Sequence, residues 1–155
     1  MQYLWMLLFA AGAVGLDQMV KYLVVANIDL YEHLPVIPGV MNLTYYQNTG
    51  AAFSMLEGQQ WLFALIFAIF TAAIIWEFKK NSLKLTTFER WCVAAVWAGG
   101  VGNMIDWLRL GYVIDMFETA FITFPVFNVA DCFITCGAIA LIAHLIFCNK
   151  EFWKK

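Results

Sequence analysis

Asp115 and Asp131 are the two residues whose surroundings point most directly to chemistry. Each ends a mostly apolar run, the first at 111–115 (GYVID) and the second at 127–131 (FNVAD). A carboxylate at the centre of a bilayer costs about 2.5–3.5 kcal/mol or more, so acids kept at membrane depth usually face inward and have a functional role. We therefore look for the function of this chain where these acids meet.

A facing pair of carboxylates has a definite chemistry. When two such groups come close together they do not both ionise easily, so the pair holds one shared proton and titrates as a unit. One carboxylate can then take a proton from water while the other protonates a peptide carbonyl oxygen, which needs no Ser or Cys nucleophile. A purely structural alternative is that Asp131 caps the helix that follows it and Asp115 pairs with Arg109.

The composition predicts an α-helical integral membrane protein with one domain over 1–155. Of the 155 residues, 63% are hydrophobic and 13% are charged, and the mean hydropathy is +0.74, well outside the usual range of soluble domains. Four uncharged stretches predict four transmembrane helices, at 1–16, 59–76, 91–105 and 132–149. The first and third reach the roughly 20 residues of a span only by including Asp17 and Lys21, or Asp106. A removable signal peptide would also explain the first stretch, but the basic residues that normally precede one are missing.

The segments between the predicted spans are more than simple loops. Residues 34–46 and 121–127 have strand-like composition, which predicts a small sheet on the outer face of the membrane. Residues 51–56 suit a short interfacial helix. Just before them, Asn48 and Gly50 can present backbone groups to a substrate in extended conformation.

The distribution of basic residues predicts the orientation in the membrane. Seven of the nine Lys and Arg residues lie between the second and third spans or after the fourth, namely Lys79, Lys80, Lys84, Arg90, Lys150, Lys154 and Lys155. The positive-inside rule puts both termini in the cytoplasm and sends the acidic regions 27–58 and 106–131 to the other side. Nothing in this distribution suggests a nucleic-acid partner.

Small and polar residues lie near the same ends of the predicted spans. Gly99 belongs to a glycine-rich run that lets another backbone approach closely, and helix packing is the simplest interpretation of that run. Asn103 carries an amide that must find partners inside the membrane and can position a peptide. Asp17 and Lys21 are four residues apart and share one helix face, where a structural tether is the favoured interpretation.

The sequence predicts neither a metal ion nor a cofactor. The four cysteines lack the spacing of a metal site and fall in predicted spans, where reduced and buried thiols are expected. They are Cys92, Cys132, Cys136 and Cys148.

Five blocks in order along the chain resemble the bacterial lipoprotein signal peptidase family, the type II signal peptidases. The blocks are DQxxK at 17–21, NTGAAF at 48–53, GGVGNMID at 99–106, GYVID at 111–115 and FNVAD at 127–131. The resemblance implies a four-helix membrane aspartic protease with an outer-face sheet and a short surface helix. It also implies the substrate, prolipoproteins whose lipobox cysteine carries diacylglycerol, cut on the amino side of that cysteine.

By the same resemblance, Asp115 and Asp131 are the catalytic pair. The positions that surround the substrate or support the pair are Asn48, Gly50, Gly99, Asn103 and Asn128. Asp17 and Lys21 match a block that we expect to have a supporting role. The chain has Trp107 where the family commonly has Arg, and Met116 where it commonly has Phe. Arg109 is the nearby cation, and we expect it to have a supporting role.

We therefore predict a monomeric aspartic endopeptidase of the bacterial cytoplasmic (inner) membrane, with lipid-modified prolipoproteins and membrane lipids as partners. A transporter or proton-coupled channel also keeps inward acids, but in this chain the acids cluster toward one end of the predicted spans. A metal-dependent lipid head-group transferase needs closely spaced acids, whereas Asp106, Asp115 and Asp131 are scattered along the sequence.

Overall fold

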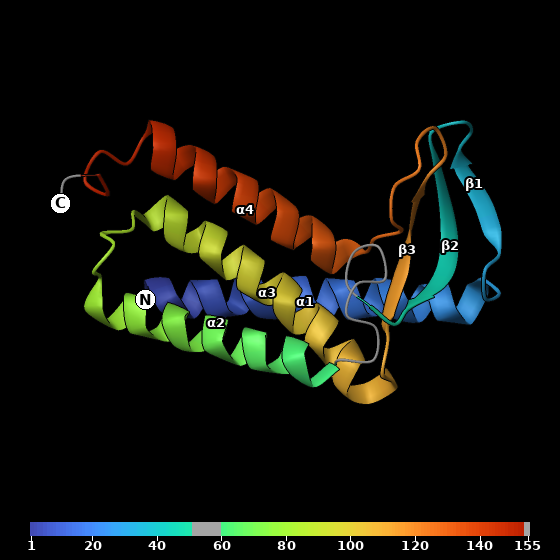
Figure 1. Cartoon of the computed structure of the whole chain (residues 1–155), viewed down its shortest axis with the longest axis horizontal. Coiled ribbons are helices and arrows are strands. Elements are labelled where there is room, and N and C mark those ends of the chain that lie inside the picture. The colour runs from blue at the N-terminus through green and yellow to red at the C-terminus, as the bar shows by residue number, and fades with distance from the viewer. Residues whose placement is uncertain (51–59, 154–155) are drawn as a thin grey trace.

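Long helices and a small sheet make up the computed structural model, which describes residues 1–50 and 60–153. Over these residues the helices are α1 (Gln2–Asn27), α2 (Gln60–Lys80), α3 (Thr87–Leu110) and α4 (Val129–Phe147), and the strands are β1 (His33–Ile37), β2 (Met41–Asn48) and β3 (Val113–Thr119). The helices run side by side and the sheet stands across one end of them, while the N-terminus and the last described residues lie at the other end (Figure 1).

Three of the predicted spans have the length and composition needed to cross a membrane. They are α1, the part of α2 from Trp61 to Lys80, and α4. Only 6% of the α2 span and 11% of the α4 span are buried within the protein, so most of their apolar side chains face outward, as in lipid-facing helices. The expected extension of the first span through Asp17 and Lys21 is confirmed, because both residues lie within α1.

The third predicted span, at 91–105, corresponds to α3, which is less apolar than the other three helices. It carries Asn103 and Asp106 in place of aliphatic side chains and packs most extensively against α4 and α1. It begins with a capping box in which Thr86 and Glu89 exchange hydrogen bonds, and it ends at Gly111, whose φ of 81° is in the left-handed region that glycine tolerates.

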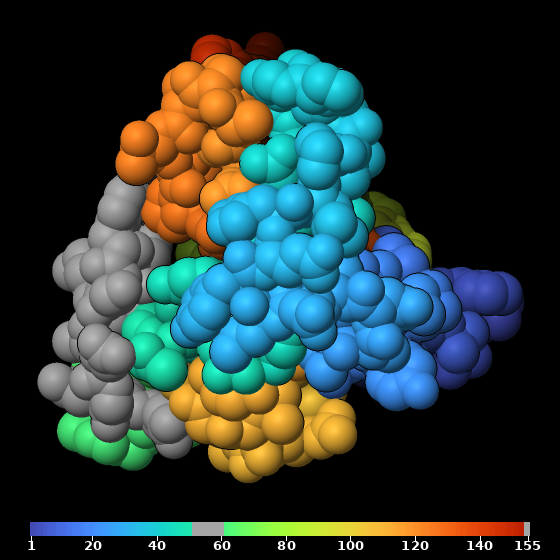
Figure 2. Space-filling view, turned by 90° about the vertical axis from the view of Figure 1, so that its right-hand side faces the viewer, coloured from blue at the N-terminus to red at the C-terminus, as the bar shows by residue number. Residues whose placement is uncertain are grey.

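The sheet is antiparallel with the order β1-β2-β3. Seen from the sheet end, the β1–β2 hairpin (cyan) and the segment around β3 (orange) lie above the end of α3 (gold), and the end of α1 (blue) lies beside them (Figure 2). The predicted strand-like segment 34–46 is confirmed as this hairpin. The strand predicted at 121–127 is wrong, because the third strand is Val113–Thr119 and only Phe127 of the predicted segment forms a bridge, to Phe117.

The error has a physical reason. The 121–127 segment is rich in aromatic and β-branched residues, but several of its side chains are exposed and Pro125 cannot donate a ladder hydrogen bond. The true strand contains two acids, Asp115 and Glu118, whose partners come from other elements. The short helix predicted at 51–56 lies outside the described residues.

Small residues let the central helices approach closely. Ala10 and Ala13 of α1 form a core cluster with Ala98 of α3. A Cβ atom built on Gly99 would lie 2.4 Å from the backbone oxygen of Ala130 and 2.7 Å from the side chain of Ile134, both in α4. The glycine therefore allows the first turn of α4 to rest on α3.

We expect Gly99→Ala to lower the unfolding free energy by about 1–3 kcal/mol, because the added methyl group must push the start of α4 away from α3. Thermal unfolding in detergent measures this change. Gly12→Ala is the matched control, since a Cβ atom at Gly12 meets nothing within 4 Å. Equal stability of the two variants would contradict the assigned packing role of Gly99.

Candidate active site

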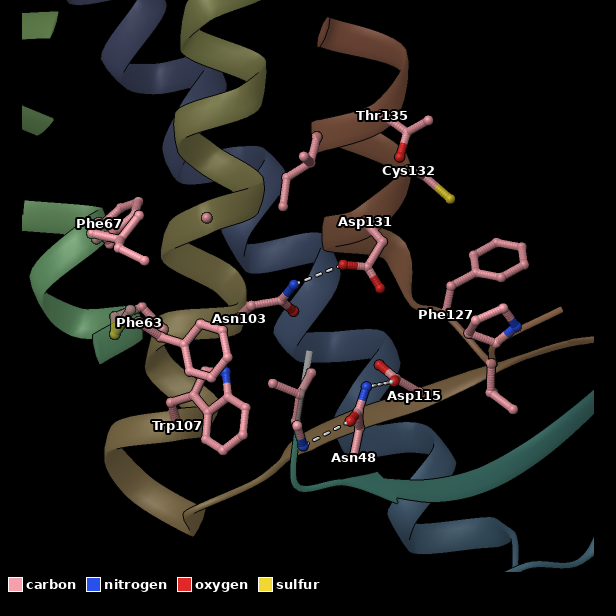
Figure 3. A pocket seen from close by; sticks show the side chains of 18 of the residues that line it. Asn48, Phe63, Phe67, Asn103, Trp107, Asp115, Phe127, Asp131, Cys132 and Thr135 are labelled. Carbon is pink, nitrogen blue, oxygen red and sulfur yellow. Dashed lines mark hydrogen bonds between the residues drawn. The ribbon is translucent and has the colours of Figure 1, made fainter. Parts of the chain in front are cut away.

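Asp115 and Asp131 meet in one cavity at the sheet end of the helices. Asp115 is the third residue of β3, and Asp131 lies in the first turn of α4. Both line a cavity of about 740 Å³. The Asp115 carboxylate points into it from β3 and the Asp131 carboxylate from α4 (Figure 3). The two aspartates predicted from their sequence setting are therefore brought together.

Asp131 combines a capping role with its position in the cavity. Asn128 is the N-cap of α4, and its side-chain oxygen accepts from the Asp131 N–H at 2.9 Å. The Asn128 backbone N–H donates to Asp131 Oδ2 at 3.1 Å, and Asn103 Nδ2 donates to Oδ1 at 2.8 Å. The N-cap is therefore Asn128, and Asp131 takes part in capping only as the N3 residue of the capping box, with its carboxylate facing the cavity.

Asp115 is almost completely buried, with 1% of its surface exposed, and is held by two amides. Asn48 Nδ2 donates to Oδ2 at 2.9 Å, and Asn128 Nδ2 donates to Oδ1 at 2.6 Å. The alternative pairing of Asp115 with Arg109 is wrong. Arg109 lies in the last turn of α3, where it is exposed and its charge complements the helix dipole.

The electrostatic surroundings favour a proton on Asp115. Its pKa is raised from 3.8 to about 7, first because burial disfavours the charged form and also because the charge of Asp131 repels it. The hydrogen bonds from Asn48 and Asn128 and the positive charge of Lys21 act in the opposite direction without cancelling the effect.

A buried ion cluster lies behind the asparagines. Lys21 is 1% exposed, and its ammonium group lies 2.9 Å from Asp17 Oδ2 and 2.8 Å from Asp106 Oδ2. Gln18 Nε2 donates to Asp106 Oδ1 at 3.0 Å. The i,i+4 pairing of Asp17 with Lys21 is confirmed.

Asp106 and Gln18 were not identified as site residues from the sequence. The sequence did offer a signal for each. Asp106 is an acid at the end of an apolar stretch, and Gln18 is an amide directly after Asp17.

The other predicted residues fall into different positions. Asn48, Gly50 and Asn103 line the cavity, and Asn48 Oδ1 accepts from the Gly50 N–H at 3.0 Å. Gly99 instead faces the backbone of α4, while the neighbouring Gly100 lines the cavity.

The cavity has an aromatic wall that the sequence did not predict. Trp107 is 8% exposed and stacks on Phe63 of α2 with ring centroids 5.3 Å apart and an interplanar angle of 12°. Both rings line the cavity. Met116, the other departure from the family pattern, is fully buried in a core cluster with Val24 and Ile114. Of the two departures, Trp107 is therefore the one that contacts the site.

Within residues 1–50 and 60–153, no group of three or more His, Cys, Asp or Glu side chains is arranged to hold a metal ion. Asp17 and Asp106 both bind a cation, and that cation is the ammonium group of Lys21.

The chain is similar to known proteins over most of its length. A family model described as Signal peptidase (SPase) II matches residues 9–147. A relative from Enterococcus faecalis named lipoprotein signal peptidase is 46% identical over 143 residues, which cover 92% of this chain and 88% of the relative. A relative of the same name from Streptococcus thermophilus is 45% identical over 135 residues, covering 85% of this chain and 86% of the relative.

Two solved structures described as a bacterial membrane enzyme share the fold. The first has a TM-score of 0.85 at 31% identity, and the match covers 97% of this chain and 91% of the chain in that structure. The second has a TM-score of 0.81 at 32% identity, and the match covers 93% of this chain and 94% of the chain in that structure.

We expect Asp115 to lose its proton as the pH rises through about 7, because its pKa is raised to that value. The infrared band of protonated carboxyl groups should lose one group's intensity over this range, and Asp115→Asn should remove that step. Glu118→Gln is the control on the same strand, since hydrogen bonds from Asn42 and His33 lower the pKa of Glu118. A wild-type spectrum that does not change between pH 5 and pH 9 would contradict the assignment.

Proposed function

Since this chain belongs to the signal peptidase II family, we propose that it is an aspartic endopeptidase that removes the signal peptide from diacylglyceryl-modified prolipoproteins, with Asp115 and Asp131 as the catalytic pair. The single observation that carries the proposal is that these two carboxylates face one mostly apolar cavity. The cut would fall on the amino side of the lipidated cysteine.

The pair would hold one proton near neutral pH, and Asp115 is the better candidate to carry it. Burial raises its pKa to about 7. Asp131 receives hydrogen bonds from the Asn103 side chain and the Asn128 backbone, which suit an ionised carboxylate. Asp131 would then act as the general base and Asp115 as the general acid.

The reaction would proceed by attack of a water molecule. Its oxygen bonds to the scissile carbonyl carbon while Asp131 accepts a water proton and Asp115 gives its proton to the carbonyl oxygen. When the tetrahedral intermediate collapses, the carbon–nitrogen bond breaks and the leaving nitrogen takes the proton held by Asp131. Asp115 recovers a proton from a hydroxyl group of the intermediate, and the pair returns to its starting state.

The cavity suits a substrate with apolar chains. One side is formed by α2, with Phe63, Phe67 and Phe70, and the other by α4, with Ile134 and Cys136. Several lining side chains are also exposed at the surface, including Ile66 at 53% and Phe124 at 52%. A lipid-modified substrate could therefore enter sideways from the bilayer, with its acyl chains against these walls and its scissile bond at the aspartates.

The orientation in the membrane follows from the charges at the two ends of the helices. Lys79 and Lys80 end α2, and Arg90 lies at the start of α3, at the end away from the sheet. By the positive-inside rule this end would be cytoplasmic and the catalytic pair would lie near the outer face. We propose that α3 also spans the membrane, shielded from lipid by its neighbours.

Hydrolysis is favoured over ion transport by the position of the acids. Asp17, Asp106, Asp115 and Asp131 gather at the sheet end of the helices. A transport path would need polar groups along the length of the span.

We expect Asp115→Asn and Asp131→Asn each to lower the cleavage rate by roughly 10²–10⁴-fold, the usual contribution of a general acid or base. The measurement is a gel-shift assay in liposomes with a diacylglyceryl-modified prolipoprotein. Asp29→Asn is the control, since Asp29 is an exposed acid outside the cavity. Substantial turnover by a folded Asp115→Asn or Asp131→Asn variant would overturn the catalytic assignment, and equal cleavage of unlipidated substrate would overturn the lipid requirement.

We expect Trp107→Ala to raise KM for the lipidated substrate about 3–10-fold, because an aromatic contact contributes about 0.5–1.5 kcal/mol. Phe63→Ala should have a similar effect, since the two rings form one wall. Trp5→Ala is the control, because Trp5 is 61% exposed on α1 and does not line the cavity. Steady-state kinetics in mixed micelles measure the change, and an unchanged KM in both wall variants would rule out substrate contact.

A further inference from the structure

Lys21 has its three hydrogen-bond donors fully used inside the protein. Its ammonium group donates to Asp17 Oδ2 at 2.9 Å, to Asp106 Oδ2 at 2.8 Å and to Asn103 Oδ1 at 3.1 Å. A lysine ammonium group has three N–H donors and no acceptor, so its partners must all present oxygen. Lys21 does not line the cavity, which means that it has no direct contact with a substrate there.

The two carboxylates that Lys21 binds each hold the backbone next to a catalytic aspartate. Asp17 Oδ1 accepts from the Ala130 N–H at 2.9 Å, and Ala130 directly precedes Asp131. Asp106 Oδ2 accepts from the Ile114 N–H at 3.2 Å, and Ile114 directly precedes Asp115. One ammonium group therefore joins the two backbone segments on which the catalytic pair depends.

The third partner of Lys21 is the amide that binds Asp131. An asparagine amide can be turned over so that its oxygen and nitrogen exchange places, and only the donors around it decide which way it faces. Asn48 and Asn128 are fixed by backbone N–H groups, which donate to their oxygens from Gly50 and Asp131.

Asn103 lies within a helix, and the donors to its oxygen are side chains. They are Lys21 Nζ at 3.1 Å and Asn128 Nδ2 at 3.0 Å. Because Lys21 can only donate, the Asn103 oxygen must face it and the Asn103 NH₂ group must face Asp131 Oδ1, at 2.8 Å.

We infer that Lys21 is a positioning residue, which sets the separation of Asp115 and Asp131 through Asp17 and Asp106 and turns the Asn103 amide so that it donates to Asp131. This inference rests on the proposed function of the pair. It differs from a general structural role because it predicts a loss in the chemical step rather than in substrate binding or in folding alone.

The test is the kinetics of Lys21→Gln on the diacylglyceryl-modified prolipoprotein. Glutamine removes the charge and brings an acceptor oxygen that can face Asn103 and turn its amide over. We expect kcat to fall about 100-fold with KM unchanged, because a misplacement of about 1 Å in a catalytic group costs about that much. An unchanged kcat in the folded variant would overturn the inference.

A double-mutant cycle with Asn103→Leu separates the amide from the rest of the cluster. If Lys21 acts partly through Asn103, the kcat of the double variant should exceed, by about tenfold or more, the value obtained by multiplying the two single losses. Losses that simply multiply would show that the two residues act independently and would overturn this part of the inference.

Glu89→Gln is the matched control for loss of a buried ionisable group. Glu89 is 0% exposed and binds His144 and Asn149 at the far end of α3. We expect it to lower the unfolding temperature with kcat per folded molecule unchanged. If Glu89→Gln lowers kcat as much as Lys21→Gln does, the effect of Lys21 is general destabilisation of the protein. That result would overturn the inference.

If Lys21→Gln does not fold, the same cycle is run with Lys21→Arg. Arginine keeps the charge but presents its donors in a planar fork that does not match the three acceptors, so kcat should again fall with KM unchanged. Full activity of Lys21→Arg would overturn the inference. Failure of the proposed function itself is distinguishable, because the wild type would then not cleave this substrate.

Discussion

A carboxylate buried beside another carboxylate must be supplied with hydrogen-bond donors, and the polar interior of this protein is arranged around that requirement. Asp115 and Asp131 receive donors from three asparagines that come from a strand, a helix interior and a helix N-cap. Each amide also has a donor on its oxygen side. The asparagines therefore cannot turn over without losing two interactions, which keeps the donors directed at the acids.

The same requirement explains why a sheet lies across the ends of the helices. One acid of the pair comes from the first turn of a helix and the other from an extended strand, so the sheet is needed to place Asp115. The strand β3 follows α3 after the turn at Gly111, and Asp106 near the end of α3 binds the backbone of that strand. The ion cluster thus ties the sheet to the bundle.

The sequence predicted the parts of this structure that depend on local composition. The apolar stretches identified α1, α2 and α4 as membrane spans, and the setting of Asp115 and Asp131 identified residues that share a cavity. The family resemblance was confirmed by the match over residues 9–147. It also named Asn48, Asn103 and Asn128, whose contacts with the acids are now visible.

What the sequence did not predict depends on contacts between distant segments. The i,i+4 spacing of Asp17 and Lys21 suggested a tether, but it gave no sign that Asp106, 85 residues after Lys21 in the chain, would share the same cation. The third strand was assigned to 121–127 because strand propensity reflects packing against partners that a single segment does not reveal. Trp107 was noticed as a departure, but its stacking on Phe63 required the approach of α2 and α3.

The helices divide two tasks, and α3 takes part in both. The polar network uses the inward faces of α1 and α3, where Asp17, Lys21 and Asp106 are 1–2% exposed. The apolar cavity wall comes mainly from α2 and α4, whose side chains are mostly apolar and outward-facing, and Trp107 of α3 adds to it. Under the proposed function, the apolar wall is the side from which a membrane-confined substrate would enter. The asparagines lie at the boundary between these two regions, because their amides bind the acids that face the cavity and Asn103 also binds Lys21 behind them.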